Sequence, residues 1–365
     1  MRKKFFVEIA GRLKRGDFQW LLRRARHGLS IPSEALTKKC VSGPILASVA
    51  VTYRCNERCL YCELPSRAGP PGDEDTASMK DLLSQLARLG VSTVSFTGGE
   101  PLLREDMAEL ISYASGFKVS TNLTTNGIKL TPGLSESLIA AGLDSLNISL
   151  DSADPEYVNT VRSSPKAFEG AVTAIETMAA AKKKQSSSRP NLSVSTVLTS
   201  RNCEDVTGLI RFIKEKGADA IYFNVMEVDF NLYRENRSRN YLDDREKLGA
   251  ALALIRELRL KDAFIDNSPR YLARLGQYVS GPFPDVSCFA GYHSMVIDYR
   301  GAVFPCFYYF QNNRALATLA RGEGLREFWH GREYERVRRE LLSCRECFFG
   351  CQMELNELYQ MTLLR

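Results

Sequence analysis

The sequence predicts an α/β fold built on a parallel sheet, followed by a smaller cysteine-rich α+β unit. Between residues 45 and 225, short β-rich runs alternate with helical patterns, as in repeated βα units. Several helical patterns end in glycine, namely Gly90, Gly142 and Gly217, which is typical of helix C-termini. With 365 residues and 44% apolar content, the chain is long enough for about two domains, each with a core of its own.

The repeated units comprise six strands and five intervening helices. The strands are expected at Ile45–Thr52, Thr93–Thr97, Lys118–Leu123, Ser145–Leu150, Leu192–Leu198 and Ala220–Val225. The helices are expected at Met79–Leu89, Glu105–Ser115, Leu134–Ala141, Ala167–Lys183 and Glu204–Lys216. Polar clusters follow several strands, and parallel α/β folds bind ligands at that carboxyl edge. We therefore expect the functional site there.

The remaining chain is expected to be less regular. A helical stretch covers 243–260, and prolines and glycines then mark a connection. A hairpin is expected at Ser294–Asp298 and Ala302–Phe304, and a single helix at Leu325–Leu342. This organisation predicts a basic helical segment at 1–44, a sheet domain at 45–260, a connection at 261–287 and a cysteine-rich domain at 288–365.

The positive charge is local. Residues 1–39 carry 11 Lys and Arg against 3 Asp and Glu, whereas the rest of the chain has a net charge of −2. This distribution gives no indication of nucleic acid as a partner. A helix around Trp20 could pack on the sheet domain with a solvated basic face, rest on an anionic membrane surface, or bind an acidic partner. No apolar run is long enough to span a bilayer, and no secretory signal is evident, so a cytoplasmic location is expected.

Three cysteines follow the first expected strand. Cys55, Cys59 and Cys62 share one loop, where three thiolates can hold three irons of a cubane cluster and leave the fourth iron open. The alternative is zinc, which usually takes four ligands. No fourth Cys or His lies within twenty residues of Cys62, which disfavours zinc.

This loop resembles that of the radical S-adenosylmethionine (SAM) superfamily, C-x3-C-x-aromatic-C, with Tyr61 in the aromatic position. The resemblance implies a partial (β/α)6 TIM-type barrel and a [4Fe-4S] cluster bound by the three cysteines and SAM. It also implies reductive cleavage of SAM to a 5′-deoxyadenosyl radical that abstracts hydrogen from a substrate. An external electron donor such as flavodoxin or ferredoxin would supply the electron.

Further strand ends resemble the SAM-binding elements of the superfamily. Gly98-Gly99-Glu100-Pro101 corresponds to its GGEP element, in which the glycines let the backbone approach the ligand and the carboxylate accepts from the SAM ammonium group. As alternatives to a role in SAM binding, Asn126-Gly127 could form a simple turn, and Ser149 and Asp151 could cap the next helix. The residues that the resemblance assigns to SAM are Tyr61, Gly98, Gly99, Glu100, Asn126, Ser149, Asp151 and Arg162, with Arg162 a candidate partner of the SAM carboxylate.

A second cysteine set resembles the twitch and SPASM extensions of this superfamily. Cys288 is followed after 12 residues by Gly301 and after four more by Cys306, and Cys344, Cys347 and Cys351 come later. Five cysteines are too few for two fully ligated four-iron clusters, so one auxiliary [4Fe-4S] cluster is expected. The resemblance assigns Cys288, Cys306, Cys344 and Cys347 as ligands, and Cys351 is either supernumerary or replaces Cys347. A four-cysteine zinc site is the alternative.

These resemblances imply a radical SAM enzyme, with substrate identity left open by the fold. The first 44 residues lack the length and strand pattern of a winged-helix leader binder, which favours a small-molecule substrate such as a sugar, antibiotic or cofactor precursor. The auxiliary cluster would then assist its oxidation. The alternative is a maturase that modifies a peptide or protein. A non-enzymatic metal-binding scaffold is the third hypothesis.

Overall fold

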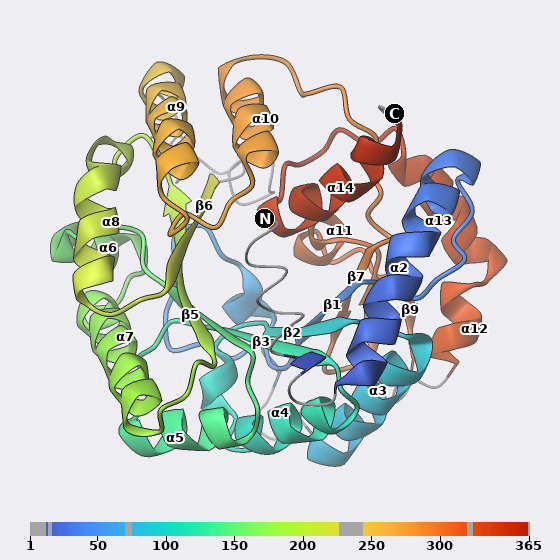
Figure 1. The fold of residues 1–365 in the computed structure, drawn as a ribbon, viewed down its shortest axis with the longest axis horizontal. Coiled ribbons are helices and arrows are strands. Elements are labelled where there is room, and N and C mark those ends of the chain that lie inside the picture. Colours follow the sequence, from blue (N-terminus) through green and yellow to red (C-terminus); the bar gives the residue numbers. More distant parts are fainter. Residues whose placement is uncertain (1–11, 14–16, 70–74, 226–243, 320–323, 364–365) are drawn as a thin grey trace.

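The computed structural model describes residues 12–13, 17–69, 75–225, 244–319 and 324–363 (Figure 1). In these parts of the chain, nine strands form one sheet in the order β6-β5-β4-β3-β2-β1-β7-β8-β9. The first six strands run parallel, as the sequence predicts. They are β1 (Leu46–Ala50), β2 (Thr93–Thr97), β3 (Ser120–Thr125), β4 (Ser145–Ser149), β5 (Asn191–Leu198) and β6 (Ala220–Val225).

Helices line the outside of these strands and complete the partial barrel (Figure 1). They are α3 (Thr76–Leu89), α4 (Met107–Gly116), α5 (Pro132–Ala140), α6 (Pro155–Val161), α7 (Ala167–Lys184), α8 (Val206–Glu215) and α9 (Arg245–Lys261). Short 3-10 turns add η1 (Leu64–Arg67), η2 (Pro101–Leu103) and η3 (Cys203–Asp205). The strands and helices enclose a continuous apolar core, to which Leu86 and Phe96 contribute fully buried side chains.

Local signals explain where the helices begin and end. The Asp75 side chain accepts hydrogen bonds from the amides of Ala77 and Ser78, which would otherwise have no partner at the start of α3. At its end, Gly90 adopts φ +96°, a left-handed conformation that favours glycine. Gly142 and Gly217 likewise adopt positive φ, so the glycines predicted at the helix C-termini are confirmed.

The C-terminal hairpin extends the barrel sheet. The expected strands form as β7 (Ser294–Asp298) and β8 (Ala302–Phe304), followed by β9 (Ala317–Thr318). β7 pairs in parallel with β1, from Leu46 opposite Ser294 to Ala50 opposite Asp298. The Tyr53 hydroxyl also donates to Asp298 Oδ2 at 2.7 Å. The cysteine-rich region is thus joined to the strand that leads into the first cysteine loop.

The C-terminal helices differ from the expected pattern. The single helix expected at Leu325–Leu342 is two helices, α12 (Leu325–Trp329) and α13 (Arg332–Leu341), because the chain folds back at Gly331. The Arg338 guanidinium then lies 4.4 Å from the Trp329 ring centroid. Three more helices were not expected: α10 (Pro269–Ser280), α11 (Phe307–Gln311) and α14 (Gly350–Leu363). α10 lies within the stretch interpreted as a connection. Its Pro269 begins the helix instead of interrupting it, because a proline in the first turn lacks only an N–H that would have no partner there.

The N-terminal helix α2 (Phe18–Thr37) packs along α14 (Figure 1). Its inward face buries Trp20, and the Tyr359 hydroxyl of α14 donates to Glu34 at 2.7 Å. The helix is confirmed for these residues, whereas residues 1–11 lie outside the described chain. Its outward face is mainly apolar, with Arg26 also exposed. Among the described helices, none is both long enough and apolar enough to cross a bilayer.

Candidate functional site

The first three cysteines share a loop directly after β1. Cys55, Cys59 and Cys62 are all half-buried, and the loop backbone is held by hydrogen bonds from the Arg58 and Leu60 amides to the end of α6. Burial raises the pKa of each thiol, that of Cys55 to about 11. The thiols are therefore neutral at pH 7 until a metal displaces their protons.

The donor set fits an iron–sulfur cluster. Thiolates are the usual cluster ligands, and these three lie close enough that a charge on Cys62 disfavours ionisation of Cys55 and Cys59. Within the described residues, no three His, Cys, Asp or Glu side chains converge closely enough to hold a single metal ion. A cubane does not need that convergence, because its ligands attach to different irons.

The two glycines after β2 bring that strand end against the chain that enters the cysteine loop. A Cβ on Gly98 would overlap the carbonyl oxygen of Thr52, and one on Gly99 would overlap that of Arg54. Gly98 also adopts φ +125°. The sequence interpretation was that these glycines let the backbone approach the ligand. The structure gives a different first reason, namely close backbone packing, although Gly98 also lines the cavity described below.

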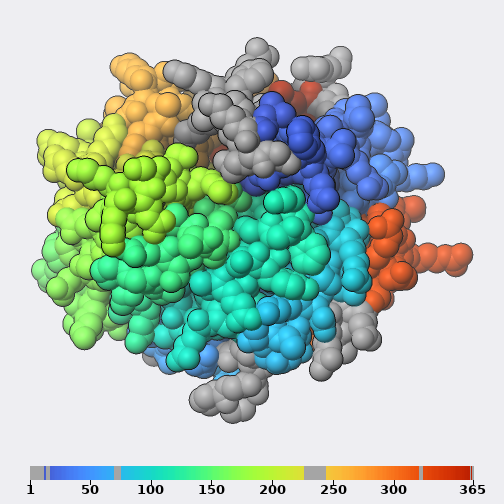
Figure 2. Space-filling model, turned by 60° about the horizontal axis from the view of Figure 1, so that its bottom comes forward, coloured from blue at the N-terminus to red at the C-terminus, as the bar shows by residue number. Residues whose placement is uncertain are grey.

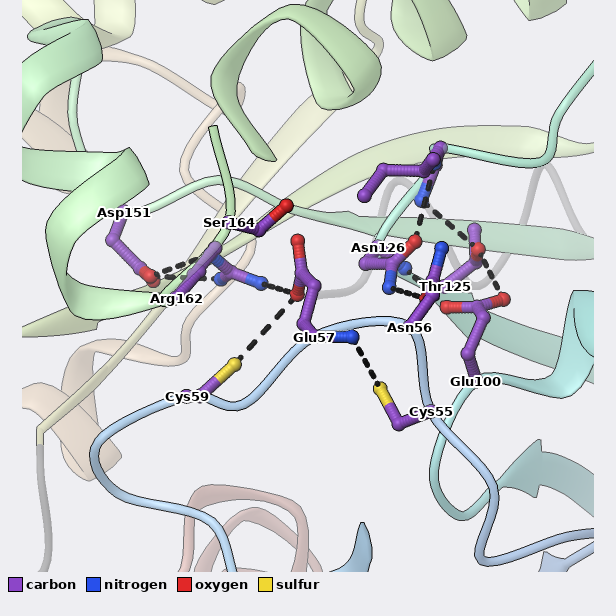
Figure 3. Close-up of polar contacts among 12 residues, drawn as sticks. Cys55, Asn56, Glu57, Cys59, Glu100, Thr125, Asn126, Asp151, Arg162 and Ser164 are labelled. Carbon is purple, nitrogen blue, oxygen red and sulfur yellow. Dashed lines mark hydrogen bonds and ion pairs between the residues drawn. The ribbon is translucent and has the colours of Figure 1, made fainter. Parts of the chain in front are cut away.

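Glu100 connects the ends of two strands (Figure 3). Its Oε1 accepts from the Leu102 amide at 2.9 Å and the Thr125 hydroxyl at 2.7 Å, and its Oε2 accepts from the Asn126 amide at 2.7 Å. Burial raises the pKa of Glu100 to about 7. The Asn126 side chain donates in turn to Asn56 Oδ1 at 2.7 Å, inside the cysteine loop. The expected convergence of Glu100 and Asn126 beside the cysteines is therefore observed, while their contacts to SAM stay a prediction.

A buried charge network lies under the other end of the loop (Figure 3). Asp151 Oδ2 accepts from the Tyr61 hydroxyl at 2.9 Å and from Arg162 Nη2 at 2.7 Å. Arg162 Nη1 also pairs with Glu57 Oε2 at 3.4 Å. These contacts bring together Tyr61, Asp151 and Arg162, which the sequence assigned to SAM. In this structure the Arg162 guanidinium pairs with two of the protein's own carboxylates, so its pairing with the SAM carboxylate remains a prediction.

Glu57 is the site residue that sequence reasoning missed. It is almost fully buried between Cys55 and Cys59, and the Cys59 thiol donates to its Oε2 at 3.6 Å. Burial raises the pKa of Glu57. An acidic side chain inside a loop has no periodic or spacing signal of its own. Ser149, by contrast, lies at the end of β4 opposite Ser195 of β5 and does not line the cavity.

The second cysteine set divides in space. Cys288, Cys306 and Cys344 belong to one small buried cluster with apolar side chains of α13, Val337 and Leu341. Cys347 is also buried. Burial raises the pKa of Cys288 to about 11.

Cys351 lies elsewhere, in the first turn of α14, where it lines the barrel cavity beside Gly350. Burial raises its pKa to about 12. Burial raises the pKa of Tyr222 of β6, and the nearby Cys351 raises it further; Tyr222 lines the same cavity. Of the two ligand candidates that the sequence leaves open, Cys351 lines the barrel cavity and Cys347 does not.

The barrel encloses a cavity of about 600 Å³ that borders the cysteine loop at Tyr61 and Cys62. Polar strand residues line one part of it, namely Asn122, Thr124, Asn147, Ser193, Ser195 and Asn224. Aromatic residues of the C-terminal region line another part, namely Phe307, Phe310, Phe348 and Phe349. Among the described lining residues, Asp266 and Glu354 are acidic, and none is Lys, Arg or His. The cavity is large enough for a side chain or small molecule next to the metal loop.

Comparisons with known proteins agree with this geometry. Residues 49–213 match the family model of the radical SAM superfamily, and residues 288–348 match that of the SPASM iron–sulfur cluster-binding domain. A PqqA peptide cyclase of Xanthomonas campestris pv. campestris is 30% identical over an alignment of 316 residues that covers 82% of this chain and 77% of that protein.

Two other relatives are each 27% identical. The mycofactocin maturase MftC of Mycobacterium tuberculosis matches over 84% of this chain and 75% of its own length. An AdoMet-dependent heme synthase of Methanosarcina barkeri matches over 82% and 86%, respectively.

Among solved structures, Streptococcus suis SuiB bound to the precursor peptide SuiA has the same fold. The TM-score is 0.64 at 19% identity, over 90% of this chain and 74% of that one. The residues matched by the two family models include all of the assigned cysteine ligands except Cys351. The cofactors of this chain are therefore SAM, a [4Fe-4S] cluster that binds SAM, and auxiliary iron–sulfur. The chain is an enzyme that belongs to the radical SAM superfamily and carries a SPASM iron–sulfur domain.

Proposed function

We propose that this enzyme modifies a peptide or protein substrate. The observation that carries the proposal is the 30% identity to a PqqA peptide cyclase along most of both chains. The name of the mycofactocin maturase and the precursor peptide bound to SuiB point in the same direction. The strand pattern of the first 44 residues favours a small molecule, whereas the comparisons favour the alternative of a peptide or protein.

The cavity is consistent with a peptide side chain as the reacting group. It lies inside the barrel and borders Cys62, so a side chain that enters it comes next to the metal loop. Aromatic side chains on one wall and amide and hydroxyl groups on the other can hold an amphipathic group. A peptide can place one side chain in the cavity while the rest of the peptide stays at the surface of the enzyme.

The cysteines are proposed to hold two clusters. Cys55, Cys59 and Cys62 would hold the SAM-binding cluster, which when reduced supplies the electron for SAM cleavage. Glu100 and Asn126 fix the loops around it, while Tyr61, Asp151 and Arg162 fix the loop that carries Cys59. Cys288, Cys306, Cys344 and Cys347 would hold one auxiliary cluster, because Cys351 faces the cavity. A donor such as flavodoxin or ferredoxin would reduce them.

A small carbon-rich substrate is the second candidate, and the heme synthase relative is the observation that favours it. The two candidates predict different sources for the hydrogen that the enzyme removes. A deuterated substrate would transfer its deuterium to 5′-deoxyadenosine, so the label reports the substrate class even while the substrate itself is unidentified.

The test uses cells that naturally contain the protein, grown in heavy water and separated into a peptide fraction and a peptide-free metabolite fraction. Each fraction is incubated anaerobically with the reconstituted enzyme, unlabelled SAM and reductant. Mass spectrometry should detect deuterated 5′-deoxyadenosine with the peptide fraction. Deuterium transfer from the metabolite fraction alone would overturn the proposal in favour of the second candidate. A Cys59→Ala variant is the control for transfer that does not depend on the enzyme.

A further inference from the structure

The first long helix of the described chain has an exposed apolar stripe, which consists of Phe18, Leu22, Leu29 and Leu36. Their exposed fractions are 62%, 70%, 81% and 68%. Nine large apolar side chains are exposed in the described residues, and six of them fall between residues 13 and 41. Single exposed leucines are ordinary on a protein surface, whereas a contiguous group marks an interaction site.

The stripe is a continuous face of α2. Ala25 and Pro32 are also exposed, so the outward positions follow one another at steps of four and three residues from Phe18 to Leu36. At 1.5 Å per residue, this face is about 27 Å long. The opposite face, with Trp20 and His27, is buried against the barrel and α14. The helix is therefore anchored in the protein and still presents an apolar face to solvent.

Within residues 17–39, the exposed charged side chains have one sign. Arg26 and Lys39 are exposed, whereas the two acidic residues of this range, Asp17 and Glu34, are buried. Asp17 pairs with Arg12 at 3.2 Å, and Glu34 accepts hydrogen bonds from the chain after the helix. In sequence, residues 1–39 have a net charge of +8. In Figure 2 the blue N-terminal segment lies on the surface of the molecule. The stripe thus combines apolar side chains with an excess of positive charge.

We infer that α2 docks on an anionic lipid bilayer. Apolar side chains on one face enter the interfacial region of a bilayer, and flanking Lys and Arg contact acidic headgroups. A second copy of the chain fits less well. Arg26 lies near the middle of the stripe, so a twofold pairing of two α2 helices would bring two guanidinium groups together without an exposed acidic partner from this segment.

The test measures cosedimentation of the full-length, cluster-loaded enzyme with phosphatidylcholine vesicles that contain about one third phosphatidylglycerol. The stripe variant carries Leu22→Gln and Leu29→Gln. Its matched control carries Leu254→Gln and Leu260→Gln, two exposed leucines of α9 outside the stripe. The wild type and the control should bind the anionic vesicles, and the stripe variant should bind about tenfold more weakly. Binding to pure phosphatidylcholine should be weak for all three proteins.

Iron content and SAM cleavage verify that the stripe variant is folded, because neither leucine contacts the cysteine sites. The inference is overturned if the wild type does not bind anionic vesicles, or if the stripe variant binds them as well as the wild type does. A dimer in sedimentation velocity that the stripe variant loses, without vesicle binding, would assign the stripe to a second copy. Retention of wild-type but not variant protein on an acidic helical protein, again without vesicle binding, would assign it to a protein partner.

Discussion

The two cysteine regions place the same kind of ligand in opposite surroundings. Around Cys59 the neighbours are charged: Glu57 lies 3.6 Å from its sulfur, and the Arg162 guanidinium pairs with Glu57 and Asp151. Around Cys306 the neighbours are apolar side chains such as Val337 and Leu341. The first region borders the barrel cavity, whereas the three clustered cysteines of the second do not line it.

This difference indicates how each region serves its cluster. A cluster that must admit SAM needs a loop held firmly in place with one side open, and a buried charge network provides that without filling the open side. A cluster with four protein ligands needs only to be enclosed, and apolar packing does so while it excludes water. Solvent exposure and hydrogen bonds to sulfur also set cluster potentials, so the two sites are expected to differ in reduction potential.

The largest expected effect comes from the open region. Cys59→Ala should abolish formation of 5′-deoxyadenosine from SAM under reducing, anaerobic conditions, because two thiolates cannot retain the cluster. Cys40→Ala, at a cysteine outside both sets, should keep wild-type turnover. Retained turnover in Cys59→Ala would contradict the assignment of this loop to SAM cleavage and would revive the scaffold hypothesis.

Metal analysis tests the closed region. The reconstituted wild type should contain about eight irons per chain, and Cys306→Ala and Cys347→Ala should each lose about four of them. Cys351→Ala should keep about eight irons, because Cys351 is not among the cysteines that pack together around Cys306. Iron loss in Cys351→Ala with retention in Cys347→Ala would reverse that assignment. About four irons and one zinc in the wild type would replace the auxiliary cluster with a zinc site.

Disruption of the buried charge network around Arg162 should lower the stability of the folded chain. Arg162→Ala leaves Asp151 and Glu57 without their buried partner, so the free energy of unfolding should fall by about 3 to 5 kcal/mol. Anaerobic urea denaturation measures this change. As a control, Lys184→Ala removes an ion pair with Glu136 that is mostly exposed, and should cost less than about 0.5 kcal/mol. Equal effects in the two variants would show that the network does not stabilise the loop.

The smallest expected effect concerns the cavity between the two regions. Burial raises the pKa of Glu354 from 4.5 to about 7. The folded state therefore keeps this proton at pH values where the unfolded chain has lost it, so the stabilising contribution is complete below pH 4.5 and disappears as pH rises through 7. Glu354→Gln should remove about 1 to 3 kcal/mol of this pH dependence. Urea denaturation at a series of pH values measures this change, and an unchanged pH dependence in Glu354→Gln would contradict the role of burial.

Much of the fold is predictable from the sequence, because buried parallel strands are short apolar runs that stand out between helices. The structure confirms all six such strands. The sequence does not reveal the partner of the second edge of β1, since β7 comes about 250 residues later and a strand pattern carries no information about its neighbour. The sequence also does not reveal α10, because a proline can stand either at the start of a helix or just after its end, and the residue alone does not tell which.

The site is predictable where spacing carries the chemistry and not where contacts do. The cysteine spacing and the glycines after β2 identify the metal loop and the strand end beside it. The pairing of Arg162 with Asp151 and Glu57 depends on three separate segments, and no local pattern tells which carboxylate a guanidinium will reach. Of the arginines around Trp20, Arg26 is exposed, as one of the alternatives for α2 requires, whereas Arg23 turns inward and donates to the Phe117 carbonyl at 2.8 Å, which no sequence pattern predicts.

The parallel pairing of β1 with β7 also has a consequence for synthesis of the chain. β1 finds β2 early, but its other edge is completed only by residues about 250 positions later. At roughly 5 to 20 residues per second, the ribosome needs about 10 to 50 s to deliver them. Throughout that interval an apolar strand has an open edge, the feature that promotes aggregation. This edge of β1 is therefore open while the intervening residues are synthesised, and the sheet that supports both cysteine regions is completed only after β7 has been made.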